Sequence, residues 1–183
     1  MPVVRRSAGG IRVDRVNIRS LERDSIVGFL MAHRELFRGH VCDWGCGLSP
    51  YRSIVEQAGA RYTGYDDPEL PGSVAPTVIR PAFPPPWNAI VCTQVIQYVP
   101  NPQAFIRLRR DDILPGGALL MTGPTNWPIV EKEDRWRLTP EGIGALLEDA
   151  RFAVVVAGRR AEVEFAGERW PLGWWAVGVK AKR

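Results

Sequence analysis

Apolar residues recur at two different spacings along the chain, and each spacing predicts one kind of element. From Ile26 to Phe37 they follow one another at helical intervals, which predicts an amphipathic helix over 21–37 with Ser20 as its N-cap. Short apolar runs bounded by glycine, proline or polar residues are typical of buried strands instead. Such runs are found at 41–44, 61–65, 89–92, 118–122, 152–157 and 174–179.

Cap and turn residues between these runs mark further helices. A capping residue followed by proline predicts helix starts at Ser49-Pro50, Asn101-Pro102 and Thr139-Pro140. Helices that alternate with strands in this way indicate an α/β fold, with a sheet covered by helices on both faces. In such sheets, ligands bind beyond the carboxyl ends of the strands.

Two segments depart from this alternation. The segment 66–87 is rich in proline, which excludes a long helix and leaves room only for a short edge strand at 77–79. Residues 1–19 have no clear period and are expected to form an N-terminal arm. The remaining residues, 20–183, are then expected to form a single domain with one core.

Composition and charge exclude several classes of protein. The net charge is +4 and the pI is about 9.2, but the arginines are scattered, which argues against a nucleic-acid partner. No stretch reaches the roughly 18 apolar residues of a membrane-spanning helix, and no secretory signal is apparent, so we expect a soluble cytoplasmic protein. The cysteines, at 42, 46 and 92, suit neither a disulfide framework nor a metal site.

The turn Gly45-Cys46-Gly47 directly follows the first predicted strand. A lone G-x-G pattern is not specific, because turns of this kind occur in many folds. A dinucleotide-binding fingerprint would need a glycine where Pro50 stands, and the Gly-Lys-Ser/Thr of a Walker loop is absent. The turn therefore lets the backbone approach a ligand closely, but it is not built for pyrophosphate.

Asp43 lies two residues before Gly45, at the end of an otherwise apolar strand. A carboxylate buried there costs free energy unless something pairs with it. A cationic ligand would provide the partner, and so would the backbone N–H groups of the turn.

Asp66 ends the second predicted strand, 19 residues after Gly47. That offset suits a carboxylate that accepts hydrogen bonds from both hydroxyls of a ribose. The alternative is an aspartate that shapes a turn before Pro68, and the adjoining Asp67 fits either role.

Together these residues resemble the class I methyltransferases that use S-adenosylmethionine (SAM), and specifically their type 11 group. The segments that carry the resemblance are VCDWGCG (41–47), YTGYD (62–66), WNAIVCTQVIQYVP (87–100), LPGGALL (114–120) and RLTPEG (137–142). They occur in the family's order and span about residues 20–180. The resemblance implies a Rossmann-like, doubly wound, mostly parallel sheet of seven strands whose last strand is antiparallel. The proline-rich segment would reduce that sheet at one edge.

The resemblance also implies roles for the matching positions. The cofactor-binding residues it implies are Asp43, Trp44, Gly45, Cys46, Gly47, Asp66, Asp67, Thr93 and Gln94. The backbone of the glycine turn would line the methionine part of SAM, Asp43 would help to hold its amino group, and Asp66 would bind its ribose. Trp127, Asp134, Trp136 and Arg137 lie in the segment that faces the methyl acceptor in this group.

The sequence departs from the family pattern at three places. Ser49 replaces the third motif glycine, and Gln97-Tyr98 replaces the Glu-His pair that is common after the fourth strand. The short link between Asp66 and Asn88 lacks the acidic residue and the helix that the family places near adenine. The adenine end of the site is therefore expected to be altered.

A hydroxyl or amine acceptor can require a general base. No histidine follows His40, which leaves Glu131, Asp134 and Tyr98 as candidates. Asp134 also has a simpler interpretation, as the ion-pair partner of a neighbouring arginine.

Trp127 and Trp136 suit stacking on a sugar or ring acceptor, with core packing as the alternative.

The leading hypothesis is a SAM-dependent methyltransferase that acts on a small-molecule or saccharide acceptor by in-line methyl transfer. A non-catalytic, partner-binding protein with the same fold is the second hypothesis, motivated by the short 66–88 link. An RNA or protein methyltransferase is the third, and only the pI and the arginine content favour it.

Overall fold

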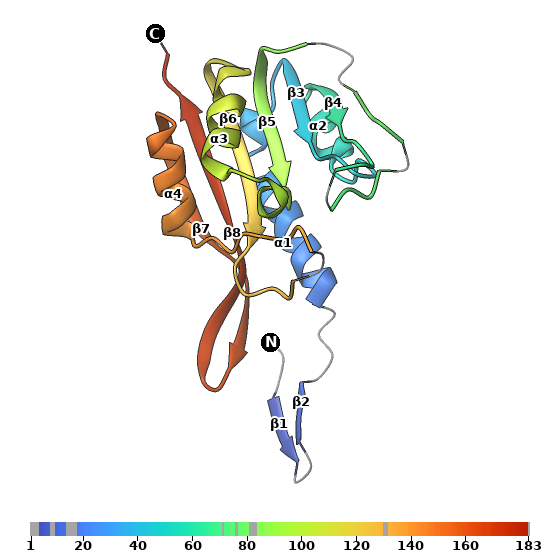
Figure 1. Cartoon of the computed structure of the whole chain (residues 1–183), viewed down its shortest axis with the longest axis vertical. Helices are drawn as coiled ribbons and strands as arrows, with labels where there is room; N and C mark the ends of the chain where they lie inside the picture. The colour runs from blue at the N-terminus through green and yellow to red at the C-terminus, as the bar shows by residue number, and fades with distance from the viewer. Residues whose placement is uncertain are drawn as a thin grey trace.

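The computed structural model describes residues 4–7, 10–13, 18–70, 72–75, 77–80, 84–129 and 132–182 (Figure 1). The strands are β1 (Val4–Ser7), β2 (Gly10–Val13), β3 (His40–Trp44), β4 (Arg61–Tyr65), β5 (Trp87–Thr93), β6 (Ile113–Pro124), β7 (Phe152–Phe165) and β8 (Glu168–Lys180). The α-helices are α1 (Ile18–Ala32), α2 (Arg52–Gln57), α3 (Pro102–Asp111) and α4 (Pro140–Asp149), with short 3₁₀ helices η1 (Arg34–Leu36) and η2 (Ile96–Tyr98).

The main sheet has the order β4-β3-β5-β6-β8-β7. Neighbouring strands from β4 to β6 pair in parallel, whereas β8 pairs antiparallel with both β6 and β7. This arrangement confirms the predicted Rossmann-like fold with an antiparallel last strand. In the described residues, the position beyond β4 is reduced to one bridge between Asp66 and Ile79, so the short strand predicted at 77–79 does not form.

Each face of the sheet has its own apolar core, because side chains alternate along the strands. On one face, Ile90 and Leu119 pack with Ile106 of α3 and with residues of α4. On the other face, Val91 and Leu120 pack with residues of α1 and α2. The helices therefore cover both faces, as the alternation of strands and helices predicts (Figure 1).

Two predicted helix starts are wrong. Helix α1 begins at Ile18, and Ser20 lies inside it with its hydroxyl donating to Asp24, so Ser20 is not the N-cap. Ser49 has a φ of +56° and donates its N–H to the Cys46 carbonyl at 2.7 Å, so it belongs to the turn. Helix α2 starts only at Arg52, two residues after Pro50.

The other two predicted starts are confirmed. Asn101 accepts a hydrogen bond from the Ala104 N–H, and Thr139 accepts one from the Gly142 N–H.

Strands β7 and β8 extend well beyond the predicted runs 152–157 and 174–179. They pair from Phe152 opposite Lys180 to Phe165 opposite Glu168, through a two-residue turn in which both residues have positive φ. The outer part of this hairpin extends past the carboxyl ends of β5 and β6, on the side where α1 begins (Figure 1). Its residues are largely exposed and of mixed charge, so no apolar run predicts this part of the hairpin.

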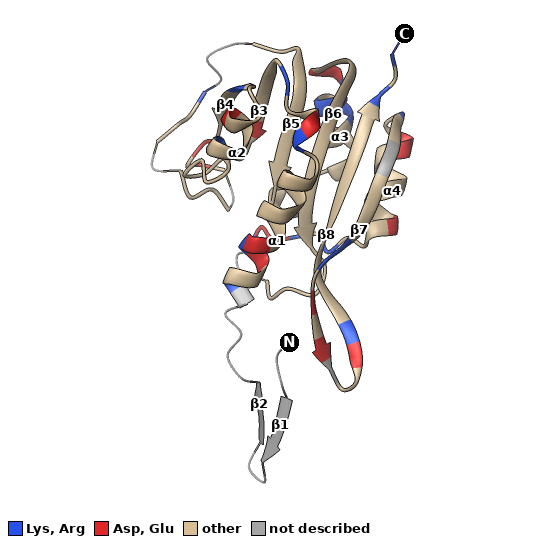
Figure 2. Cartoon of the chain, turned by 180° about the vertical axis from the view of Figure 1, so that it is seen from behind, with Lys and Arg blue, Asp and Glu red and all other residues tan. Residues whose placement is uncertain are grey.

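Residues of the predicted arm form a separate small sheet, in which β1 pairs antiparallel with β2. Basic and acidic residues both occur along α1 and along the β7–β8 hairpin (Figure 2). None of the described helices combines the length and apolar character that a membrane crossing requires.

Arg160 connects the hairpin to α1. Its side chain is buried, and its guanidinium donates to the Glu22 carbonyl at 3.1 Å and to Ser25 Oγ at 3.0 Å. The Glu22 carboxylate lies 3.4 Å away. Burial lowers the pKa of Arg160, and the charge of Glu22 opposes that shift.

We therefore expect Arg160→Ala to lower the free energy of unfolding by about 2–3 kcal/mol, because it removes charge-assisted hydrogen bonds inside the protein. The neighbouring Arg159 is exposed, and Arg159→Ala should change stability by less than about 0.5 kcal/mol. Urea denaturation of both variants measures the difference. Equal stability of the two would contradict this role for Arg160.

Candidate functional site

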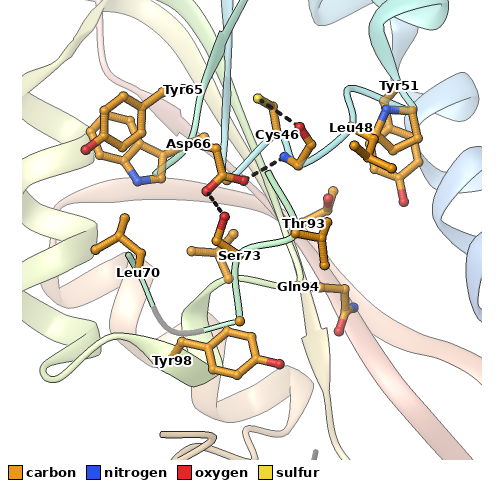
Figure 3. A pocket seen from close by; sticks show the side chains of 17 residues that line it. Cys46, Leu48, Tyr51, Tyr65, Asp66, Leu70, Ser73, Thr93, Gln94 and Tyr98 are labelled. Carbon is orange, nitrogen blue, oxygen red and sulfur yellow. Dashed lines mark hydrogen bonds between the residues drawn. The ribbon is translucent and has the colours of Figure 1, made fainter. Parts of the chain in front are cut away.

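A cavity of about 350 Å³ opens at the carboxyl ends of β3, β4 and β5 (Figure 3). Its lining residues are Trp44, Gly45, Cys46, Gly47, Leu48, Pro50, Tyr51, Tyr65, Asp66, Leu70, Gly72, Ser73, Val74, Thr93, Gln94, Val95 and Tyr98. The cavity lies where a doubly wound sheet is expected to bind its ligand. Its size falls within the range of roughly 300–1,000 Å³ that is typical of small-molecule sites.

The glycine turn forms the inner wall of the cavity. Gly45 and Gly47 have φ values of +76° and +52°, which favour glycine. A Cβ atom on Gly45 would lie 2.3 Å from a methyl carbon of Val95. The N–H groups of Gly45 and Cys46 donate to the Tyr65 carbonyl at 2.8 and 3.1 Å, so the turn is fixed to the end of β4.

Asp66 follows β4 and is 4% exposed. Its carboxylate accepts hydrogen bonds from the Gly47 N–H at 2.7 Å, from the Asp67 N–H at 2.8 Å and from Ser73 Oγ at 2.8 Å. Figure 3 shows the bonds to Gly47 and Ser73 within the cavity wall. Asp66 thus fixes the glycine turn while it also lines the cavity.

Asp43 lies in β3, two residues before Gly45, and is 1% exposed. Tyr62 donates its hydroxyl to Oδ2 at 2.7 Å, whereas Oδ1 has no hydrogen-bond partner among the described residues. Desolvation raises the pKa of Asp43 to about 7; the Tyr62 hydrogen bond opposes the rise and the charge of Asp66 adds to it. Desolvation, followed by the charge of Asp43, raises the pKa of Tyr62, which therefore remains a proton donor.

The end of β5 supplies the opposite wall. Gln94 has a φ of +56°, which is a strained conformation for a residue with a side chain. Its N–H donates to the Thr122 carbonyl at 3.0 Å, and its amide Nε2 donates to the Thr122 hydroxyl at 3.3 Å. These bonds to β6 hold Gln94 and the adjacent Thr93 at the cavity.

Trp44 forms a rigid side wall. Its ring lies 4.2 Å from that of Tyr65, centroid to centroid, and the Arg109 guanidinium lies 3.5 Å from the Trp44 centroid. Arg109 is in turn paired with Asp112 at 2.7 Å. Cation–π contact and ring packing therefore fix the indole from both sides.

Most of the predicted cofactor residues converge on this cavity. Those that line it are Trp44, Gly45, Cys46, Gly47, Asp66, Thr93 and Gln94. Asp43 is buried and is not among the lining residues. Asp67 is not among the lining residues, and its Oδ1 accepts the Glu69 N–H at 3.0 Å, which is the bond of a turn-forming aspartate.

The predicted acceptor residues are placed differently. Tyr98 lines the cavity, whereas Trp127, Asp134, Trp136 and Arg137 are not among its lining residues. Both carboxylate oxygens of Asp134 accept from the Arg137 guanidinium, which also donates to the Trp127 carbonyl at 3.1 Å. Trp136 donates its indole N–H to the Val99 carbonyl at 2.7 Å. These contacts connect the described residues on the two sides of positions 130 and 131. Glu131 lies outside the described residues.

Sequence reasoning missed about half of the lining. The missed residues are Leu48, Pro50, Tyr51, Tyr65, Leu70, Gly72, Ser73, Val74 and Val95. Several of them lie next to predicted cofactor residues in the sequence, and this proximity was the signal that could have predicted their place in the lining. The lining residues from Leu70 to Val74 come from the proline-rich link, where no periodic pattern marks a wall.

Comparisons with known proteins agree with this architecture. No family model matches the chain. Over 163 aligned residues the chain is 26% identical to a ubiquinone biosynthesis O-methyltransferase from Stutzerimonas stutzeri (strain A1501), with 70% of each protein covered.

Solved structures are similar over most of the chain. A putative SAM-dependent methyltransferase from Listeria monocytogenes has a TM-score of 0.66 at 12% identity, with 89% of this chain and 100% of that one covered. The magnesium protoporphyrin IX methyltransferase of Synechocystis PCC 6803, crystallised with SAM, has a TM-score of 0.58 at 19% identity, with 94% and 87% covered. The chain therefore has the Rossmann-like fold of SAM-dependent methyltransferases.

Proposed function

We propose that this protein is a SAM-dependent methyltransferase with a small-molecule acceptor. The observation that carries the proposal is the single cavity that joins the glycine turn to Asp66 at the carboxyl edge of the sheet. The fold and the methyltransferase relative support the same activity. The cytoplasm remains the compartment that we expect from the sequence.

The residues of the cavity fit the methionine and ribose parts of SAM. Gly45, Cys46 and Gly47 would line the methionine portion with backbone, since side chains at the two glycines would clash with neighbouring residues. Asp66 would accept the ribose hydroxyls, and Thr93 and Gln94 would flank the cofactor. Asp43 would act on the cationic end of the ligand from beneath the turn.

SAM would supply a methyl group that its sulfonium has already activated. The chain's own task is then to align the acceptor and to exclude water. Of the two predicted general bases that the structure describes, Tyr98 lines the cavity and Asp134 does not, so Tyr98 is the candidate for a proton-handling role.

The cavity favours an uncharged, largely apolar acceptor. Apolar side chains of its lining remain exposed at Leu48, Leu70 and Val74, with 73%, 47% and 69% exposure. Asp66 is the only charged side chain among the described lining residues. A hydroxylated aromatic compound suits this apolar lining better than a saccharide, because the many hydroxyl groups of a saccharide need hydrogen-bond partners that apolar side chains do not offer. The O-methyltransferase name of the relative agrees with such an acceptor.

We expect the protein to bind S-adenosylhomocysteine (SAH), the demethylated product of SAM, in calorimetric titration. Asp66→Ala should weaken binding by roughly 1–3 kcal/mol, because a buried acceptor of ribose hydrogen bonds is lost. The exposed Glu69, three residues away, provides the matched control, and Glu69→Ala should leave the affinity within about twofold. Wild-type protein that binds neither SAM nor SAH at millimolar concentration would refute the proposal.

SAM affinity should rise between pH 5.5 and 7.5. The pKa of Asp43 is raised to about 7, so at low pH its carboxyl group becomes neutral and no longer attracts the cationic end of a ligand across the turn. The dissociation constant should therefore increase by up to about tenfold per pH unit below 7. Asp43→Asn should bind more weakly at pH 7.5 and show a flatter profile. An identical profile in both proteins would exclude Asp43 from binding.

Methyl transfer from radiolabelled SAM should be detected with small hydroxylated aromatic compounds and be weaker with free sugars. Asp66→Ala should reduce transfer at limiting SAM concentration, in line with its weaker binding. If SAM binds but no acceptor in a broad screen is methylated, the non-catalytic, partner-binding alternative becomes the better one.

A further inference from the structure

The carboxylate of Asp66 is nearly saturated by donors of its own chain. An ionised carboxylate offers about four lone-pair positions on its two oxygens. The Asp67 N–H and Ser73 Oγ both donate to Oδ1, and the Gly47 N–H donates to Oδ2. A ribose donates two hydrogen bonds through its vicinal hydroxyls. One of the three donors must therefore give way when Asp66 binds a ribose.

Two of these donors are fixed by the fold. The N–H of Asp67 belongs to the residue next to Asp66, so it stays close whatever the ligand. The N–H of Gly47 belongs to the turn that is already bonded to the Tyr65 carbonyl. Ser73 is different, because its hydroxyl reaches Asp66 from seven residues away.

Ser73 is also held in position by its own segment. Its hydroxyl accepts the Ala75 N–H at 3.2 Å, and its N–H donates to the Leu70 carbonyl at 3.1 Å. Gly72 packs against the Tyr98 ring, where a Cβ atom would lie 2.2 Å from a ring carbon. Val74 lies against Gly47 of the glycine turn. The segment thus brings the hydroxyl to the carboxylate from the cavity side (Figure 3).

We propose that Ser73 determines nucleoside affinity by competing with the ribose for Asp66. The inference rests on the proposed function, because it takes the ribose of SAM as the ligand of Asp66. The Ser73 hydroxyl donates to Oδ1 where a ribose hydroxyl would donate, and it leaves when the nucleoside binds. Each binding event then forms two hydrogen bonds to Asp66 and breaks one, so the affinity is lower than the cavity alone would give.

The test is calorimetric titration of SAH and of its 2′,3′-dideoxy analogue into four proteins: wild type, Ser73→Ala, Ser73→Thr and Ser53→Ala. Ser73→Ala removes the competing donor, and it should bind SAH about three- to tenfold more tightly than wild type, the scale of one hydrogen bond. The dideoxy analogue cannot displace Ser73, so wild type and Ser73→Ala should bind it equally. Ser73→Thr keeps a hydroxyl and should behave as wild type. Ser53 is exposed on α2, and Ser53→Ala should change neither affinity.

Tighter SAH binding by Ser73→Ala, confined to the ligand with the ribose hydroxyls, would support competition. Unchanged or weaker SAH binding, or an equal gain for both ligands, would overturn it while leaving the proposed function intact. If no protein binds SAH, both proposals fail. If Ser73→Ala is unstable, the affinities of wild type and Ser73→Thr for the two ligands still test the competition. If these proteins bind SAH more than about a hundredfold more tightly than the dideoxy analogue, no donor competes with the ribose for Asp66.

Discussion

The hydrogen bond from the Gly47 N–H to the Asp66 carboxylate joins the two strand ends on which the site depends. Strands β3 and β4 run parallel, with Trp44 opposite Tyr65, so both chains leave the sheet at the same edge. The turn after β3 can close onto β4 because Gly64 leaves room for the Cys46 side chain, whose sulfur would lie 2.8 Å from a Cβ atom there. A buried carboxylate is costly without partners, and backbone N–H groups supply them. The same bond therefore stabilises the edge and orients Asp66 along the cavity.

The short connection between β4 and β5 changes both the edge of the sheet and the wall of the cavity. Between β4 and β5 the described residues form one bridge, Asp66 to Ile79, in place of a seventh strand. Leu70 and Ser73 of this connection belong instead to the lining of the cavity. In the described part of this connection, the cavity wall is formed by Leu70, Ser73 and Val74 together with the backbone of Gly72.

The sequence predicts the fold well because its signals are local. Buried strands are apolar on both faces, and the caps at Asn101 and Thr139 lie directly before their helices. Ser49 misleads because its φ of +56° and its hydrogen bond to the Cys46 carbonyl come from the glycine turn, which the local pattern of serine before proline does not encode. The β7–β8 hairpin extends through residues of mixed charge, so no apolar run marks it. The contact of Ser73 with Asp66, like the ion pair of Asp134 with Arg137, depends on how a loop folds back, which periodicity does not encode.

If the cavity binds SAM through the glycine turn and Asp66, a crystal structure of the protein grown with SAH will show the ligand there. We predict electron density for the amino-acid end along Gly45 and Gly47, with the ribose hydroxyls within hydrogen-bond distance of Asp66. Density for SAH elsewhere on the molecule, or a cavity that remains free of it at saturating concentration, would show that the glycine turn and Asp66 do not form the SAM site.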